Sequence, residues 1–149
     1  MKREYPERPL VGVGAVIVEG GRVVLVRRAA EPMAGQWSIP GGLLELGETL
    51  RAGAEREALE ETGLQVEAGE VLEVLDRIVP DANGKPRFHY VLIDFLCRRI
   101  GSDLRAGGDA AEARWVRDAE LAGLGVADAA VRVIRKALAN YKSQITNHK

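Results

Sequence analysis

The sequence predicts a single domain of the α/β class, spanning residues 1–149, with a central mixed β-sheet, one internal helix and one C-terminal helix. The chain has 149 residues, the size of one ordinary domain. Its composition is 46% hydrophobic and 29% charged, which is enough apolar material for a buried core. β-branched apolar runs alternate with segments of helical periodicity, and this mixture indicates strands and helices in one sheet-based fold.

The first predicted strands are two apolar, β-branched runs, Val11–Val18 and Val23–Val26. The connection Glu19–Arg22 contains two consecutive glycines, which is typical of a tight β-hairpin. Because both runs are apolar throughout, without an alternating polar face, we expect these strands to be covered on both sides.

A loop rich in glycine and proline is predicted over Glu31–Gly47, and a loop of this length in a compact domain is usually functional. The helix predicted next, Thr49–Thr62, has good boundary signals. Thr49 can cap its first turn, and Gly63 can end it in a left-handed conformation.

The remaining chain predicts a second pair of long strands and a final helix. An Asn-Gly turn separates the two strands. The helix has Ala130, Val131, Ile134 and Leu138 at helical spacing. In order, the predicted segments are strands Val66–Val79, Phe88–Cys97 and Ala113–Val116, a short helical piece Asp118–Leu121, the helix Ala127–Tyr141 and a frayed tail 143–149.

Charge and cysteine content exclude several classes of protein. Lys and Arg total 21 against 22 for Asp and Glu, so we expect no nucleic-acid partner held by bulk electrostatics. Cys97 is the only cysteine, which excludes an internal disulfide and a four-thiolate metal site. No apolar run approaches the roughly 20 residues that span a bilayer, so we expect a cytoplasmic protein with no membrane partner.

Three acidic residues on the internal helix suggest a metal site. At about 100° per residue, Glu60 and Glu61 fall on either side of Glu57, one turn further along the helix. Like charges at this spacing repel, and a bound cation would remove the repulsion. Carboxylate oxygens without suitably placed Cys or His favour Mg²⁺ or Mn²⁺ over zinc. The alternative is a solvated acidic face. Arg56 fits both interpretations, because it can pair with Glu60 at the i,i+4 spacing and could also fold back on an acid in the preceding loop.

The segment from Gly42 to Leu64 resembles the signature of the Nudix hydrolase family. That signature is Gly, five residues, Glu, seven residues, Arg-Glu, an apolar residue, any residue, Glu-Glu, any residue, Gly and an apolar residue. The residues that fill it are Gly42, Glu48, Arg56, Glu57, Ala58, Glu60, Glu61, Gly63 and Leu64. Gly35–Gly42 and Gly108–Val116 also resemble flanking segments of this family. The resemblance implies an α/β/α sandwich.

The resemblance also implies a catalytic and metal-binding set. Glu57, Glu60 and Glu61 are the expected metal ligands, together with the carbonyl oxygen of Gly41. Glu48 and Arg56 are expected to support them. Bound Mg²⁺, or Mn²⁺, would offset the repulsion between an acidic site and a diphosphate.

The general base is left open among the acids of the helix and of the loop that precedes the last strand. Glu57 and Glu61 are the helix candidates, and Asp109 is the loop candidate. Glu112 is the competing acid in that loop, where it could instead bind substrate. Both loop acids can equally be surface turn residues.

Three further side chains are candidates for binding a small-molecule nucleotide. Arg27 and Arg28, at a strand end beside the loop, could bind phosphate or remain simple exposed charges. Trp37 could stack on a base or ribose, or pack in the core.

The family resemblance implies a reaction and leaves its substrate open. The expected reaction is hydrolysis of ADP-ribose to AMP and ribose 5-phosphate. An alternative is a nucleoside triphosphate pyrophosphatase that acts on oxidised purine nucleotides. A non-enzymatic alternative is a nucleotide-sensing regulator, which the intact motif disfavours. Many family members form homodimers, so a homodimer is a possible state.

Overall fold

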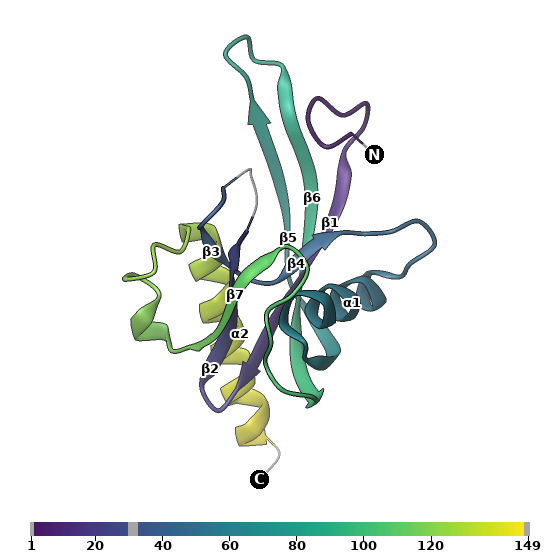
Figure 1. The fold of residues 1–149 in the computed structure, drawn as a ribbon. Coiled ribbons are helices and arrows are strands. Elements are labelled where there is room, and N and C mark those ends of the chain that lie inside the picture. Colours follow the sequence, from purple (N-terminus) through teal and green to yellow (C-terminus); the bar gives the residue numbers. More distant parts are fainter. Residues whose placement is uncertain (1, 30–32, 148–149) are drawn as a thin grey trace.

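The computed structural model describes residues 2–29 and 33–147 of the chain, with side chains up to residue 141, and confirms the mixed α/β class. Ten elements occur in these residues (Figure 1). They are β1 (Leu10–Glu19), β2 (Arg22–Arg28), β3 (Trp37–Ser38), β4 (Gly41–Leu43), α1 (Leu50–Thr62), β5 (Gln65–Pro80), β6 (Pro86–Gly101), β7 (Ala110–Val116), the 3-10 turn η1 (Asp118–Glu120) and α2 (Asp128–Asn147).

The strands form one mixed sheet in which β1 is central. Along the main path the order is β3-β2-β1-β6-β5, while β4 pairs with β1 and β7 pairs with β2. β1 runs parallel to β6 and antiparallel to β2 and β4. The first half of β1 pairs with β4 and its last residues pair with β2, so the sheet divides beside β1.

The predicted tight hairpin between β1 and β2 is confirmed. Gly20 and Gly21 have φ values of 58° and 75°, and two consecutive left-handed residues are what a type I′ turn requires. Val18 then pairs with Val23 across the turn. The two glycines therefore set the register of the central strands.

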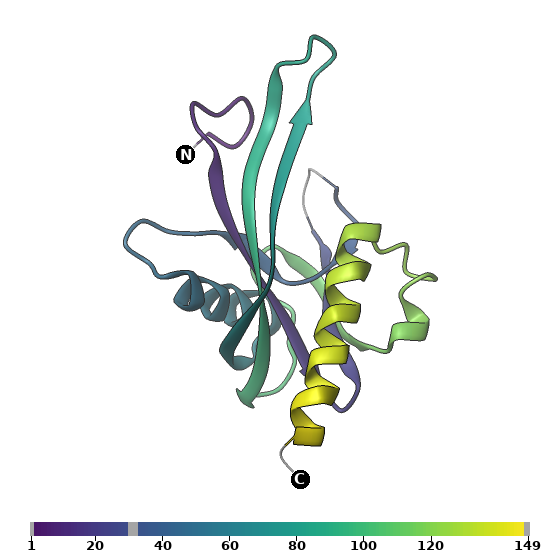
Figure 2. The same ribbon diagram turned by 180° about the vertical axis from the view of Figure 1, so that it is seen from behind.

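Each face of the sheet carries one helix and its own apolar core (Figures 1 and 2). On one face, Val16, Leu25 and Leu72 pack with Ile134 of α2. On the other, β-strand residues pack with Ala54 and Ala58 of α1. Nearly all of β1 is buried, which confirms the expectation that its strand is covered on both sides. The arrangement is an α/β/α sandwich.

The structure differs most from the prediction in two segments. The segment Glu31–Gly47, predicted as a loop, contains the short strands β3 and β4. They have two and three residues, too few to show periodicity, and they exist because β2 and β1 offer pairing partners. Helix α2 continues to Asn147, beyond the predicted end at Tyr141, because no Gly or Pro interrupts that stretch.

The β5–β6 hairpin extends well beyond the body of the sheet (Figure 1). The N-terminal residues lie beside its outer part, where Tyr5 N–H donates a hydrogen bond to the Arg87 carbonyl at 2.7 Å. Among the described residues, no helix is both long enough and apolar enough to cross a membrane.

Candidate active site

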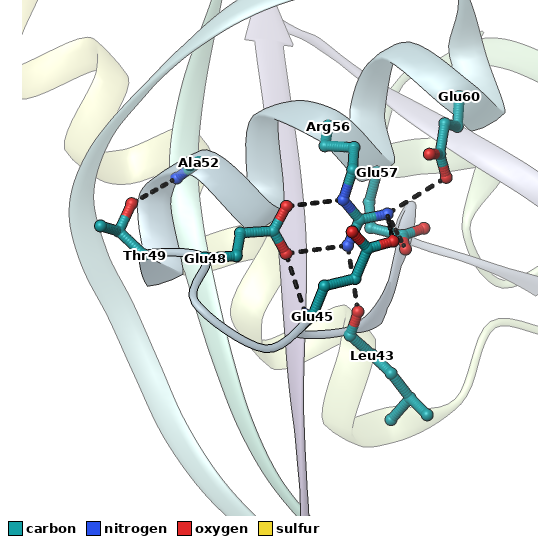
Figure 3. Close-up of polar contacts among 8 residues, drawn as sticks. All are labelled: Leu43, Glu45, Glu48, Thr49, Ala52, Arg56, Glu57 and Glu60. Atoms are coloured by element: carbon teal, nitrogen blue, oxygen red, sulfur yellow. Dashed lines mark hydrogen bonds and ion pairs between the residues drawn. The ribbon is translucent and has the colours of Figure 1, made fainter. Parts of the chain in front are cut away.

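Helix α1 is fixed at both ends by the residues that the sequence indicated. The N–H of Ala52 donates to the Thr49 hydroxyl at 3.1 Å, and Gly63 closes the helix with φ 73° (Figure 3). Beyond this end, Gly107 N–H donates to the Glu61 carbonyl at 3.2 Å. A Cβ at Gly107 would lie 2.7 Å from the Glu60 carbonyl oxygen, so only glycine allows this approach. The loop that holds Asp109 is thereby attached to α1.

The Arg56 guanidinium binds the loop that precedes the helix. Its Nε lies 2.6 Å from Glu48 Oε2, and its Nη2 lies 3.0 Å from Glu48 Oε1, which makes a two-point ion pair (Figure 3). Nη2 also donates to the Leu43 carbonyl at 3.1 Å, and Glu48 Oε1 accepts the N–H of Glu45. These contacts lower the pKa of Glu48, and the hydrogen bonds from Arg56 contribute most.

The other side of the same guanidinium faces the helix carboxylates. Arg56 Nη1 lies 2.9 Å from Glu57 Oε1 and 3.2 Å from Glu60 Oε2 (Figure 3). The Glu57 side chain is 13% exposed and the Glu60 side chain 51%. Arg56 therefore joins the loop to the acidic helix face, and its hydrogen bonds with Glu48 and, to a lesser extent, Glu57 raise its own pKa.

Glu57 lies directly against the backbone of β4. A Cβ at Gly42 would lie 2.5 Å from Glu57 Oε1, so the absence of a side chain at residue 42 makes room for this carboxylate. Burial raises the pKa of Glu57, and the charges of Glu60 and Asp109 raise it further, in spite of the ion pair with Arg56.

Glu61 is the most buried carboxylate of the helix, at 6% exposed. Its Oε1 accepts a hydrogen bond from the Gly41 N–H at 2.7 Å. Burial raises the pKa of Glu61 to about 7; the negative charges of Glu57 and Asp109 also raise it, and Arg28 lowers it. The helix therefore carries two carboxylates whose ionisation is disfavoured in the protein alone.

An open cleft of about 450 Å³ lies over this group. Acids from two separate elements line it, since Glu57 and Glu60 come from α1 and Asp109 comes from the loop before β7. The cleft is lined by Arg3, Leu43, Leu44, Glu45, Leu46, Arg56, Glu57, Glu60 and Asp109.

A family model for the Nudix domain matches residues 8–140, which include every residue lining the cleft except Arg3. The chain belongs to the Nudix family. The match confirms the resemblance carried by Gly42–Leu64, and it extends the likeness over most of the chain.

Two curated Nudix relatives have different names. An "ADP-ribose pyrophosphatase" of Methanocaldococcus jannaschii is 37% identical over 107 residues, which cover 72% of this chain and 61% of that protein. A "Putative 8-oxo-dGTP diphosphatase 2" of Mycobacterium tuberculosis is 38% identical over 112 residues, covering 73% of this chain and 74% of that protein. The chain thus spans less than two thirds of the archaeal relative.

Solved Nudix structures share the fold. The crystal structure of a NUDIX hydrolase from Nitrosomonas europaea matches with a TM-score of 0.69 and 29% sequence identity. The match covers 93% of this chain and 73% of that one. The α/β/α sandwich is therefore the Nudix fold.

The donor chemistry of the Nudix helix fits a hard divalent cation. Every donor at Glu57, Glu60, Glu61 and the Gly41 carbonyl is an oxygen, and the raised pKa values of Glu57 and Glu61 reflect burial first and then the negative charge of neighbouring acids. Within residues 2–29 and 33–147, however, no three acidic, His or Cys side chains converge into a ready ligand set. Arg56 donates hydrogen bonds to Glu57 and Glu60 instead, and the Gly41 N–H donates one to Glu61.

The predicted substrate-binding residues lie together on neighbouring strands. Arg27 pairs in register with Trp37 on β3 and with Glu112 on β7. Arg27 Nη2 lies 3.5 Å from Glu112 Oε1, so these two charges already compensate each other. Trp37 is 9% exposed within the apolar core, and the Arg114 guanidinium lies over its ring. Packing of Trp37 in the core is therefore the alternative that its position favours.

Two charged residues near the Nudix site were not predicted from the sequence. Arg3 lines the cleft, although it precedes the first strand and belongs to no motif. Asp94, on β6 in register with Gly14, is 7% exposed, and burial raises its pKa to about 6. No local pattern could identify either residue, because the position of each depends on contacts between distant segments.

Proposed function

We propose that this protein is a divalent-cation-dependent hydrolase that cleaves the pyrophosphate bond of a nucleoside diphosphate derivative. The observation that carries this proposal is the pair of carboxylates on one helix face, half-buried Glu57 beside Gly42 and buried Glu61 beside Gly41, with Glu57 lining an open cleft. Mg²⁺ or Mn²⁺, held by Glu57, Glu60, Glu61 and the Gly41 carbonyl, would supply positive charge to the phosphates and lower the pKa of a bound water.

The protein's own residues have separate roles in this proposal. Arg56 and Glu48 fix the loop against the helix, so that the carboxylates keep their places through turnover. Asp109 is the proposed general base, because it lines the same cleft as Glu57 and Glu60 and its charge acts on Glu57. Glu112 is less suitable, because it lies on β7 in an ion pair with Arg27.

The proposed substrate is ADP-ribose. Water adds to one phosphorus, the anhydride P–O bond breaks, and the products are AMP and ribose 5-phosphate; the proton of the water passes to the base. The archaeal relative named ADP-ribose pyrophosphatase supports this choice. A second candidate substrate is an oxidised purine nucleoside triphosphate, which the name of the Mycobacterium tuberculosis relative favours.

A substrate panel separates the two candidates. The protein is incubated with Mg²⁺ and ADP-ribose, NADH, diadenosine polyphosphates, deoxynucleoside triphosphates or 8-oxo-dGTP, and the products are identified. AMP with ribose 5-phosphate supports the first candidate, and pyrophosphate released from a triphosphate supports the second. Absence of turnover with every substrate would contradict the proposed function.

A further inference from the structure

The N-terminal segment is held to the outer part of the β5–β6 hairpin by several contacts. The Tyr5 hydroxyl donates to Asp81 Oδ2 at 2.9 Å, and the Tyr5 N–H donates to the Arg87 carbonyl at 2.7 Å. Arg87 Nε also lies 2.6 Å from Glu4 Oε2, and the Lys85 ammonium lies 5.2 Å from the centre of the Tyr5 ring. These contacts tie the segment to residues about 80 positions away in the sequence.

The backbone of Tyr5 indicates that this attachment has a defined geometry. Its φ is 51°, in the left-handed region that bulky side chains rarely adopt. A conformation of this kind persists only where surrounding contacts hold it. The hydrogen bonds to Asp81 and Arg87 are such contacts, and they set the direction of the chain on either side of Tyr5.

Arg3, two residues before Tyr5, lines the catalytic cleft together with Glu57, Glu60 and Asp109. Both ribbon views place the N-terminal loop beside the outer hairpin and above the loop between β4 and α1 (Figures 1 and 2). Arg3 is exposed, and within the described part of the chain its guanidinium forms no ion pair or hydrogen bond.

The other arginine lining the cleft is already paired with carboxylates. Arg56 contacts Glu48, Glu57 and Glu60. A diphosphate that enters the cleft therefore meets carboxylates whose arginine partner is already paired, and Arg3 supplies a positive charge in the cleft lining that is not paired with a carboxylate among the described residues. Guanidinium groups match phosphate oxygens in charge and in hydrogen-bond geometry.

We propose, on the basis of the hydrolase function above, that Arg3 binds a phosphate oxygen of the nucleoside diphosphate substrate. Tyr5 is the positioning residue, because its contacts with Asp81 and Arg87 hold the N-terminal segment at the cleft. The substrate site is then composed of the Nudix helix, its preceding loop and a segment outside the motif.

The direct test compares Arg3→Ala with Arg8→Ala in steady-state hydrolysis of ADP-ribose with Mg²⁺. Arg8 is an exposed arginine of the same segment that does not line the cleft, so its removal changes the net charge equally. We expect Arg3→Ala to raise KM about tenfold with kcat within about twofold, the size expected for one charge-assisted phosphate contact. Arg8→Ala should leave KM within about twofold of wild type. Equal KM values in wild type and Arg3→Ala would overturn the proposal.

Binding without turnover gives a second readout. The probe is the ADP-ribose analogue in which a methylene group bridges the two phosphorus atoms, titrated calorimetrically into each protein. Arg3→Ala should weaken its binding about tenfold, and Arg3→Lys should restore part of the loss because it keeps the charge without the planar fork. Unchanged binding in Arg3→Ala would contradict only the proposal that Arg3 binds a phosphate oxygen. Absence of turnover in wild type would instead contradict the proposed hydrolase function.

The positioning role of Tyr5 is tested with Tyr5→Phe, which removes the hydroxyl that donates a hydrogen bond to Asp81 and keeps the ring. A misplaced Arg3 predicts a rise in KM of about threefold, with unchanged kcat. In the Arg3→Ala background, the same substitution should have no further effect on KM, because the two residues act through one contact. An equal effect of Tyr5→Phe with and without Arg3 would refute the positioning role.

Discussion

The loop carboxylate Glu48 and the helix carboxylate Glu57 lie on two sides of one guanidinium, with side chains equally exposed at 13%. Their pKa values nevertheless move in opposite directions. Glu48 receives two hydrogen bonds from Arg56 and one from a backbone N–H, and its pKa is lowered. Glu57 receives one from Arg56, and its pKa is raised by burial first and then by the charges of Glu60 and Asp109.

The opposite pKa shifts indicate that the two acids have different roles. Glu48 is fully compensated by the protein, so it holds the loop in place. Ionisation of Glu57 and of Glu61, one helical turn further along, is disfavoured mainly by burial, so a proton or a cation added to them lowers the free energy of the site.

The largest expected effect is the loss of kcat on substitution of the carboxylates proposed to bind the cation. Glu61→Gln and Glu57→Gln should each lower kcat with Mg²⁺ by about a thousandfold, because each removes a charged cation ligand while the fold stays intact. Glu55→Gln is the matched control, since Glu55 lies on the same helix and accepts a hydrogen bond from Ala68 N–H instead. Wild-type kcat in either Glu57→Gln or Glu61→Gln would refute the metal-site assignment.

Stability should depend on pH through Glu61. Its pKa is raised from an ordinary 4.5 to about 7, so between these values the folded protein holds a proton that the unfolded chain has released. Without divalent cations, the stabilisation by this proton is complete below pH 4.5 and is lost as pH rises through 7, by at most about 3 kcal/mol. Urea unfolding of wild type and Glu61→Gln from pH 4.5 to 8 should show the relative stability of the variant increasing. A constant difference would contradict the raised pKa.

Asp94 provides a comparison on the opposite side of β1 from β4. Burial raises its pKa from 3.8 to about 6, so its contribution to stability should also fall with pH, between pH 4 and 6. Asp94→Asn should be relatively more stable than wild type at pH 7, by about 2 kcal/mol. This gain should be the same with and without Mg²⁺, whereas the gain in Glu61→Gln should shrink when Mg²⁺ is added. Equal responses to Mg²⁺ would remove the distinction between the two sites.

The smallest expected effect concerns Glu48. Glu48→Gln should lower the free energy of unfolding at pH 7 by about 1 kcal/mol, because a charged acceptor of the Arg56 fork becomes neutral. Glu57→Gln should cost less, since the substitution also removes repulsion from Glu60 and Asp109. Both values come from urea unfolding without divalent cations. A larger loss of unfolding free energy in Glu57→Gln than in Glu48→Gln would contradict the different roles given to these two acids.

Local chemistry explains why much of the fold and site could be predicted. Thr49 and Gly63 define α1 through interactions with their own neighbours, and the spacing of Glu57, Glu60 and Glu61 follows from helix geometry. The glycine pair at Gly20 similarly identifies the hairpin.

Features that depend on tertiary contacts could not be predicted in the same way. β3 and β4 exist through pairing with β2 and β1, and their own residues have no strand pattern. Arg3 reaches the cleft through the contacts of Tyr5 with residues about 80 positions away. Trp37 illustrates the same limit, since its sequence context allowed both stacking on substrate and packing in the core.

Calorimetric titration of the protein with Mg²⁺ tests whether Glu57 and Glu61 bind a divalent cation, because it measures cation binding without any substrate. We predict that wild type and Glu55→Gln bind Mg²⁺ with similar affinity, and that Glu57→Gln and Glu61→Gln bind it at least about tenfold more weakly. Equal affinity in wild type and both helix variants, or no Mg²⁺ binding by wild type, would contradict the account.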